Sequence, residues 1–146
     1  MPLLATENLG PISYDPSDVY NFPSGLPAFE NERSFLLVEQ PHTAPVVFLQ
    51  SVETPGLAFI TLPIDLVAPG YECRPGPGDR KALGMAGGGD VGDLIRLAII
   101  TIAGGAVTAN LRAPVLLSPA SRRAVQLVPA ESPYSPQHPV GEALCS

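Results

Sequence analysis

Few residues in this sequence could do chemistry, and their surroundings do not favour it. The chain has only two histidines, His42 and His138, and each stands beside a proline in a polar segment. A metal site or a Ser-His-Asp triad would depend on one of them. Neither has a nucleophile or further ligands at a recognisable spacing, so we expect no catalytic residue and no metal site.

The carboxylates offer no better basis for catalysis. Two acidic pairs, Asp15 with Asp18 and Asp90 with Asp93, fall in segments typical of loops. Paired catalytic carboxylates need environments that push their pKa values apart, and solvated loop carboxylates lack such environments. We therefore expect a protein that is not an enzyme.

One glycine-rich segment, residues 87–92 (GGGDVG), formally matches the GxGxxG pattern of dinucleotide-binding proteins. That fingerprint needs a strand before it, a helix after it and an acidic residue about 20 positions further on. Here a Gly/Pro-rich loop precedes the segment, a β-rich run follows it, and no acidic residue lies between Asp93 and Glu131. The segment is typical of a flexible loop, and we expect no cofactor.

The cysteines and the apolar segments bear on the compartment. Cys73 and Cys145 are too few for a disulfide framework and belong to no CxxC motif, which favours free thiols in a reducing compartment. Residues 1–10 lack the regions of a signal peptide. Residues 94–111, the longest apolar stretch, are interrupted by Arg96 and a Gly-Gly pair, whereas a bilayer takes about 20 apolar residues. We expect a cytoplasmic protein with no membrane contact.

The charge excludes one class of partner. Fourteen acidic and eight basic residues give a net charge of −6. Binding to bare nucleic acid needs clustered Lys and Arg, and the longest clusters here are the pairs Arg122-Arg123 and Arg80-Lys81. We expect no direct contact with nucleic acid. The negative charge suits a basic protein partner or serves only solubility, and charge alone does not separate these readings.

Turn residues divide the chain into short segments. The 18 prolines and 14 glycines lie mostly between apolar runs that are rich in β-branched and aromatic residues. Helix interiors tolerate neither proline nor glycine, so the pattern predicts an all-β fold with little helix. The strands, about ten in number, are expected at residues 9–14, 19–22, 34–39, 46–52, 57–62, 71–74, 94–103, 106–111, 115–118 and 124–128. The strand at 94–103 is almost continuously apolar, which indicates burial on both faces for part of its length.

The length favours one domain. At 146 residues the chain matches the commonest domain size, and no repeat or linker divides it. Sequential strands with short turns predict a single closed or nearly closed β-barrel-like domain over residues 1–146, because closure removes exposed strand edges. We expect a core over about 9–130, a loop at 75–92 with one helical turn near 81–85, and an extended tail at 131–146.

Three blocks of sequence carry a resemblance to a known family. They are residues 22–30 (FPSGLPAFE), 48–51 (FLQS) and 108–114 (TANLRAP), the last followed by YSPQHP at 134–139. Their order and spacing resemble the flagellar assembly factor FliW family over residues 9–140. The chain departs from the family pattern at three places: Ala28, where glycine is usual, Ser118, where asparagine is common, and the glycine- and proline-rich loop at 75–92.

The resemblance implies a β-barrel-like monomer that binds flagellin and CsrA, a small basic RNA-binding repressor of translation. Family members sequester CsrA and so relieve the repression of flagellin synthesis. Flagellin in turn occupies the assembly factor when export stalls, which restores repression. Such a circuit needs mutually exclusive binding and no catalysis.

On this resemblance we predict a partner-binding face. Acidic residues near the middle strands would contact CsrA, because opposite charges favour encounter. Tyr71 would anchor the contact, because tyrosine is enriched at binding hot spots. The predicted acidic residues are Glu53, Asp65, Glu72 and Asp79. The alternative is that these are ordinary solvated surface charges.

Four further residues are predicted to have structural roles. Gly25 and Pro27 have the chemistry of a tight turn. The side chain of Asn110 can satisfy backbone groups at a strand end, and Pro114 forces an extended exit from that strand.

Two other readings of the function stay open. A β-barrel can bind a small molecule, or act on it as an enzyme, when a concave pocket collects convergent polar groups. The scarcity of histidine and the absence of tryptophan argue against that reading. The chain could also be a purely structural component of a larger assembly.

Overall fold

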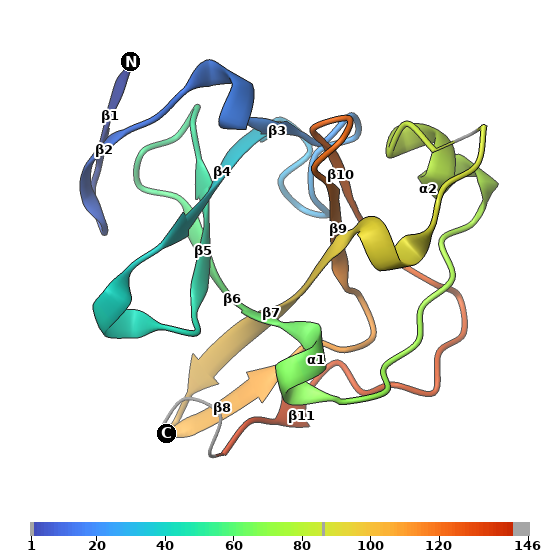
Figure 1. Cartoon of the computed structure of the whole chain (residues 1–146). Helices are drawn as coiled ribbons and strands as arrows, with labels where there is room; N and C mark the ends of the chain where they lie inside the picture. The colour runs from blue at the N-terminus through green and yellow to red at the C-terminus, as the bar shows by residue number, and fades with distance from the viewer. Residues whose placement is uncertain (1, 86, 142–146) are drawn as a thin grey trace.

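The computed structural model describes residues 2–85 and 87–141 and is dominated by short strands (Figure 1). The strands are β1 (Leu3–Thr6), β2 (Gly10–Ser13), β3 (Tyr20–Asn21), β4 (Ser34–Glu39), β5 (Val47–Ser51), β6 (Ala58–Pro63), β7 (Ile95–Ala103), β8 (Ala106–Ala109), β9 (Val115–Ser118), β10 (Arg123–Gln126) and β11 (His138–Pro139). The helices are α1 (Ile64–Val67) and α2 (Pro77–Ala82), and single 3₁₀ turns are η1 (Pro16–Asp18), η2 (Pro41–Thr43) and η3 (Val91–Asp93). No helix within these described ranges has the length and apolarity needed to cross a membrane.

Seven strands form a closed barrel. Their order is β7-β6-β5-β4-β3-β10-β9, and β9 pairs with β7 to close the ring. The pairings are antiparallel except that of β3 with β10, which is parallel and joins Asn21 to Arg123. Beyond the ring, β8 and β11 extend the sheet from β7, and β1 and β2 form a separate hairpin. The predicted all-β, barrel-like fold is confirmed.

The inside of the barrel is filled by alternate residues of its strands, as the two-residue period of a strand requires. Phe35 and Leu49 from β4 and β5 meet Leu97 and Val115 from β7 and β9, and all four are fully or almost fully buried. Phe22 packs its ring edge-to-face on Phe35 at a centroid distance of 5.2 Å. This packing makes the barrel a rigid support for whatever its outer surface carries.

The outer face of the barrel is covered on two sides. Residues of α1, the segment at 71–73 and Val140 form a second apolar cluster against β6 and β7. Strand β7 is therefore buried on both faces over part of its length, with Leu97 inside and Ala98 outside, as the sequence predicted. Leu83 and Met85, just after α2, cover the outer side of β9 in a third cluster.

The structure differs from the predicted elements around residues 64–85. The segment at 71–74 is extended but pairs with no strand, because side chains of other segments bond its backbone in place of a ladder. The helical turn lies at 77–82 and not at 81–85, because Pro77 stands at the first helical position, where its missing N–H costs nothing. Helix α1 was not predicted; Ile64 buries one side of its single turn beneath the second apolar cluster.

Both ends of the chain carry strands that were not predicted. At the start, β1 pairs with β2 over four residues. At the end, β11 pairs with β8, the Val140 N–H donates to the Val107 carbonyl at 2.9 Å, and the Val140 side chain is buried. The packed core thus extends past residue 130, because the tail covers apolar surface on β7 and β8 that would otherwise face water.

Candidate functional site

A hollow of about 390 Å³ opens on the outer surface between the segment at 71–74 and the segment at 127–134. Its lining is mixed: aromatic and proline rings alternate with charged side chains. The lining residues used below are Tyr71, Glu72, Arg74, Arg112, Pro114, Leu127, Glu131 and Tyr134. We refer to this hollow as the 71/134 groove.

Two stacked tyrosines build one wall of the groove. The rings of Tyr71 and Tyr134 lie nearly parallel, 14° apart, with centroids separated by 4.1 Å. The Tyr71 hydroxyl donates to the Leu111 carbonyl at 2.5 Å, and the Tyr134 hydroxyl accepts from the Glu72 N–H at 3.0 Å. Each tyrosine is thus fixed at both its ring and its hydroxyl, which holds the backbone of Glu72 in place.

Arg96 ties three elements together behind this wall. It projects from β7, its Nη1 donates to the Tyr71 carbonyl at 3.0 Å, and its Nη2 forms an ion pair with Asp65 of α1. The Arg96 side chain is only 19% exposed, whereas that of Asp65 is 66% exposed. The guanidinium also lies 5.9 Å from the centre of the Tyr71 ring. Arg96 therefore positions α1 and the 71–74 segment relative to the barrel.

The acidity of two groups at the groove reflects burial. Burial raises the pKa of the Tyr71 hydroxyl far above its ordinary value, with smaller contributions from Cys73 and Tyr134 that Arg96 opposes. Burial likewise raises the pKa of the free Cys73 thiol, against the influence of Arg96. A buried thiol of raised pKa is a poor nucleophile at neutral pH. The second cysteine, Cys145, lies outside the described residues.

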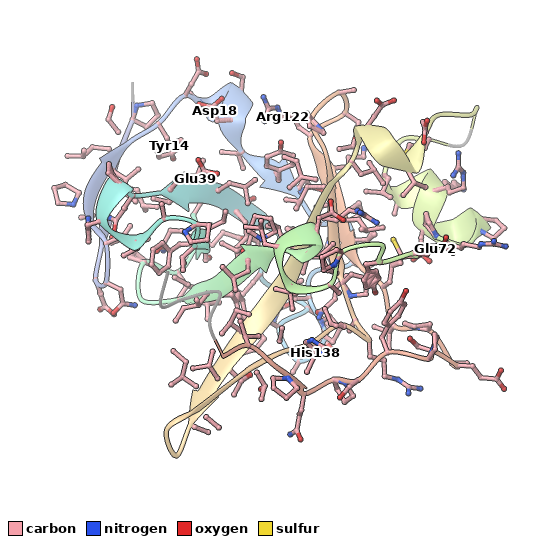
Figure 2. All side chains as sticks on the ribbon, turned by 60° about the horizontal axis from the view of Figure 1, so that its bottom comes forward. Tyr14, Asp18, Glu39, Glu72, Arg122 and His138 are labelled. Atoms are coloured by element: carbon pink, nitrogen blue, oxygen red, sulfur yellow. The ribbon has the colours of Figure 1, made fainter. Side chains whose placement is uncertain are left out.

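The structure brings three of the predicted partner-binding residues together. Tyr71 contacts both Arg96 and Tyr134, Asp65 pairs with Arg96, and the Glu72 N–H donates to the Tyr134 hydroxyl. Glu72, labelled in Figure 2, is exposed and lines the groove. Tyr71 itself is buried in the second apolar cluster, so its ring offers little surface to a partner.

The other two predicted acidic residues bond to nearby backbone. Asp79 is the third residue of α2, where its carboxylate accepts from the Gly76 N–H at 3.2 Å beside a smaller hollow that adjoins the groove. Glu53 lies at the opposite end of β6 from Asp65, and its Oε1 accepts from the N–H groups of Arg33 and Ser34 at 2.7 and 3.0 Å. The structure does not bring Glu53 to the groove.

Sequence reasoning missed Arg96 behind the groove wall and the lining residues Tyr134, Arg112 and Glu131. Arg96 is the one charge in the apolar run of β7, and a charge in a buried strand signals a specific partner. Tyr134 belongs to the block YSPQHP, but its stacking on Tyr71 joins residues 63 positions apart that no local pattern connects. Arg112 donates to the Ala130 carbonyl at 3.1 Å, and it lines the groove together with Glu131. Neither of these has a local signal.

Gly25 and Pro27 lie in consecutive tight turns. Gly25 has a φ of +67°, and a side chain there would collide with the Glu30 backbone. Pro27 follows Leu26, whose carbonyl accepts from the Phe29 N–H at 2.7 Å to close the next turn.

Asn110 and Pro114 shape the turn between β8 and β9. The Asn110 Oδ1 accepts from the N–H groups of Arg112 and Ala113, both at 3.1 Å. The Pro114 carbonyl accepts from the Leu127 N–H at 2.9 Å, and Pro114 also lines the 71/134 groove. This turn therefore forms part of the groove floor.

Groups with catalytic potential stay apart. Over residues 2–85 and 87–141, no three His, Cys, Asp or Glu side chains gather closely enough to hold a metal ion. His42 lies in η2, and His138 lies in β11 on the strand pair with β8. The glycine-rich segment leads into the single turn η3, where the Asp90 carboxylate accepts from the Gly92 N–H at 2.9 Å.

Comparisons with known proteins agree on one family. The FliW protein family model matches residues 3–140. The flagellar assembly factor FliW of Syntrophotalea carbinolica is 36% identical over 132 residues, which cover 90% of this chain and 92% of that protein. The flagellar assembly factor FliW of Caldanaerobacter subterraneus is 31% identical, with 97% and 94% covered.

A solved structure agrees with the sequence comparisons. The crystal structure of a flagellar assembly factor FliW superposes with a TM-score of 0.84 at 30% identity, covering 94% of this chain and 96% of that one. The chain therefore belongs to the FliW family of flagellar assembly factors.

Proposed function

We propose that this flagellar assembly factor is a non-catalytic, cytoplasmic, monomeric regulator that binds flagellin and CsrA, and that it antagonises CsrA and so controls flagellin synthesis. Its family membership supports a role in flagellar assembly. Its net charge of −6 supports binding of a basic RNA-binding protein, because like charge on the complex then repels RNA. It acts without a cofactor, a metal ion or a direct contact with nucleic acid or membrane.

The observation that carries the proposal is the rigid presentation of Glu72. Its backbone is held by the Tyr134 hydroxyl and by the stacked tyrosines, and its side chain is exposed at the rim of a partly apolar groove. Interfaces favour such an arrangement, because a pre-ordered group loses little entropy on binding. The exposed carboxylate of Asp65 lies on the other side of Tyr71 and Arg96.

The five predicted residues receive different roles in this proposal. Glu72 and Asp65 contact CsrA, and Tyr71 positions Glu72 without itself being the anchor. Asp79 adds negative charge at the adjoining hollow while it caps α2. The Glu53 carboxylate accepts hydrogen bonds at the start of β4, so replacement of Glu53 is expected to lower the stability of the fold and not to act directly on partner binding.

The test is charge reversal at the groove. Glu72→Lys is expected to weaken CsrA binding about tenfold or more at low salt. Raising the salt concentration should reduce the difference in CsrA affinity between the native protein and the variant. CsrA and flagellin affinities would be measured by titration calorimetry at two salt concentrations. The matched control is Glu7→Lys, which makes the same charge change at an exposed residue in the turn between β1 and β2.

Two outcomes would contradict the proposal. If Glu72→Lys and Glu7→Lys bound CsrA equally well, the groove would not be the CsrA site. If the native protein bound neither CsrA nor flagellin, and native mass spectrometry instead found a bound metabolite, the small-molecule reading would replace it. The groove volume of about 390 Å³ lies within the range of small-molecule sites, so this measurement is worth making.

A further inference from the structure

Strand β4 leaves part of one edge unpaired. It pairs with β5 from Phe35 to Glu39, but β3 covers it only at Ser34 and Phe35. Beyond Phe35, no other strand in the described part of the chain pairs with this side of β4. The last four residues of β4 therefore form a free strand edge on an otherwise closed barrel.

The hydrogen bonds at the start of β4 show which groups face that edge. The Ser34 carbonyl accepts from the Val52 N–H, beside β5, and the Arg33 carbonyl accepts from the Phe22 N–H, beside β3. Successive residues of a strand direct their backbone groups to opposite sides. The N–H and C=O groups of Leu37 and Glu39 consequently point away from β5, to the side where β3 has already ended.

The free edge lines a cleft of about 360 Å³ whose other wall is the hairpin strand β2. The Tyr14 N–H donates to the Pro2 carbonyl at 3.1 Å, so the same alternation turns the backbone of Ser13 away from β1. Pro11, the other residue with that orientation, has no N–H at all. The β2 wall thus offers few backbone N–H groups that could bond to β4 across the cleft, and the free edge of β4 stays unpaired.

The rim of the cleft is negatively charged overall. Asp18 and Glu39 are exposed on it, and Arg122 supplies one positive charge, with its guanidinium 5.0 Å from the centre of the Tyr20 ring (Figure 2). A basic side chain is favoured there by opposite charge.

We propose that this cleft binds an extended peptide segment of a partner protein, rich in β-branched and basic residues, which adds to β4 as a further strand. Free backbone groups on an exposed edge supply affinity in this mode of recognition, and side-chain pockets supply specificity. The edge is four residues long, which suits a single extended segment. The folded edge of a second copy would have to enter the cleft beside β2, so a flexible segment is the better occupant.

This site goes beyond the proposed function. It is a second surface, because the cleft adjoins Arg122 before β10 whereas the 71/134 groove adjoins Leu127 after β10. Figure 2 shows Glu72 well away from Tyr14, Asp18 and Glu39. An experiment on the cleft can therefore succeed or fail independently of the groove.

The first measurement is hydrogen exchange of the full chain with a defined probe. The probe is a capped nine-residue peptide of alternating Lys and Val, compared with its Glu-for-Lys counterpart and with a version N-methylated on alternate residues. In the free protein, the Leu37 and Glu39 amides should exchange much faster than those of Leu36 and Val38. The Lys-Val peptide should slow both, the Glu peptide should bind at least about tenfold more weakly, and N-methylation on the pairing side should abolish binding.

Variants of the protein test the same pairing. Glu39→Pro removes one free N–H without touching the ladder with β5, so it should abolish peptide binding. Its control, Glu39→Ala, should lose only the charge preference and still show protection at Leu37. Glu72→Lys should leave peptide binding unchanged.

Four results would overturn the proposal: no binding of any peptide, equal binding after N-methylation, no protection at Leu37 and Glu39, or a dimer in sedimentation whose own contact protects these amides. Because the N-methylated peptide needs no change in the protein, the proposal stays testable even if Glu39→Pro does not fold.

Discussion

Ala28 has a backbone conformation that side chains rarely adopt, with a φ of +69°. It follows Pro27 in the turn closed by Leu26 and Phe29, and a positive φ at the third turn position is where glycine is favoured. Among the described residues, Arg122 before β10 is the other non-glycine residue with a positive φ, of +58°.

We expect Ala28→Gly to stabilise the protein by about 0.5–1 kcal/mol, since removal of the left-handed strain outweighs the entropy that glycine adds to the unfolded chain. Urea unfolding measures this as a higher midpoint with an unchanged slope. Ala120→Gly, in the exposed turn before β10, serves as the control and should lower the midpoint. A lower midpoint for Ala28→Gly as well would show that the turn carries no strain.

Tyr71 makes the fold less stable at alkaline pH. Its pKa is raised on folding, above the ordinary value of 10, so the folded state holds the phenol proton more tightly than the unfolded state. The stability that this hydroxyl contributes is fully present below about pH 10 and is lost as pH rises above that value.

We expect the free energy of unfolding of the native protein to fall between pH 9 and pH 11, a range that brackets the ordinary pKa of tyrosine. In Tyr71→Phe the free energy of unfolding should fall less over the same range. The variant should also be about 1–3 kcal/mol less stable at pH 8, because the Leu111 carbonyl loses its donor. Urea unfolding at several pH values measures both effects. Tyr14→Phe, which removes a hydroxyl without a hydrogen bond to any described residue, is the control; equal pH slopes in all three proteins would contradict the argument.

Among the elements, the tail at 131–141 supports one wall of the groove. It supplies Tyr134 to the stacked pair, and the Leu111 N–H donates to the Ser135 carbonyl at 3.0 Å. It is anchored further on by β11 and by Val140, which is only 4% exposed. The groove wall and the anchor thus belong to one continuous segment.

We expect Val140→Ala to cost about 1–2 kcal/mol, from the apolar contacts that it loses in the second cluster. Hydrogen exchange should quicken at the Val140 and Leu111 amides, and proteases should cut the tail sooner. Val128→Ala, at a residue 70% exposed, is the control and should change none of these. Unchanged exchange in Val140→Ala would show that the tail is held without this anchor.

For the whole molecule, local patterns predicted most of the barrel and little of the site. Short apolar runs between turn residues placed β4 and β9 at the bounds that the structure has, and the almost continuous apolarity of 94–103 indicated burial of both faces of β7. Two-residue strands such as β11 have too short a pattern to detect, and their pairing with β8 depends on tertiary contact.

The groove was less predictable for a similar reason. Its stacked tyrosines, the Arg96 ion pair and the contact between Arg112 and Ala130 each join residues that are distant in sequence. The family resemblance and the residue types suggested that Glu53, Asp65, Tyr71 and Glu72 belong to one partner-binding face. They could not show that Tyr71 is buried or that Glu53 lies at the other end of β6.

The order in which the ring closes has a consequence for how the protein is made. Strand β3, near residue 20, receives its parallel neighbour only from β10, and β7 receives β9 from residues beyond 115. Until the ribosome has added β9 and β10, β3 and β7 lack these neighbours, and the barrel interior stays open beside them. The barrel therefore cannot close until β9 and β10 have been synthesised, and a chain truncated before β9 would expose unpaired strand edges to chaperones and proteases.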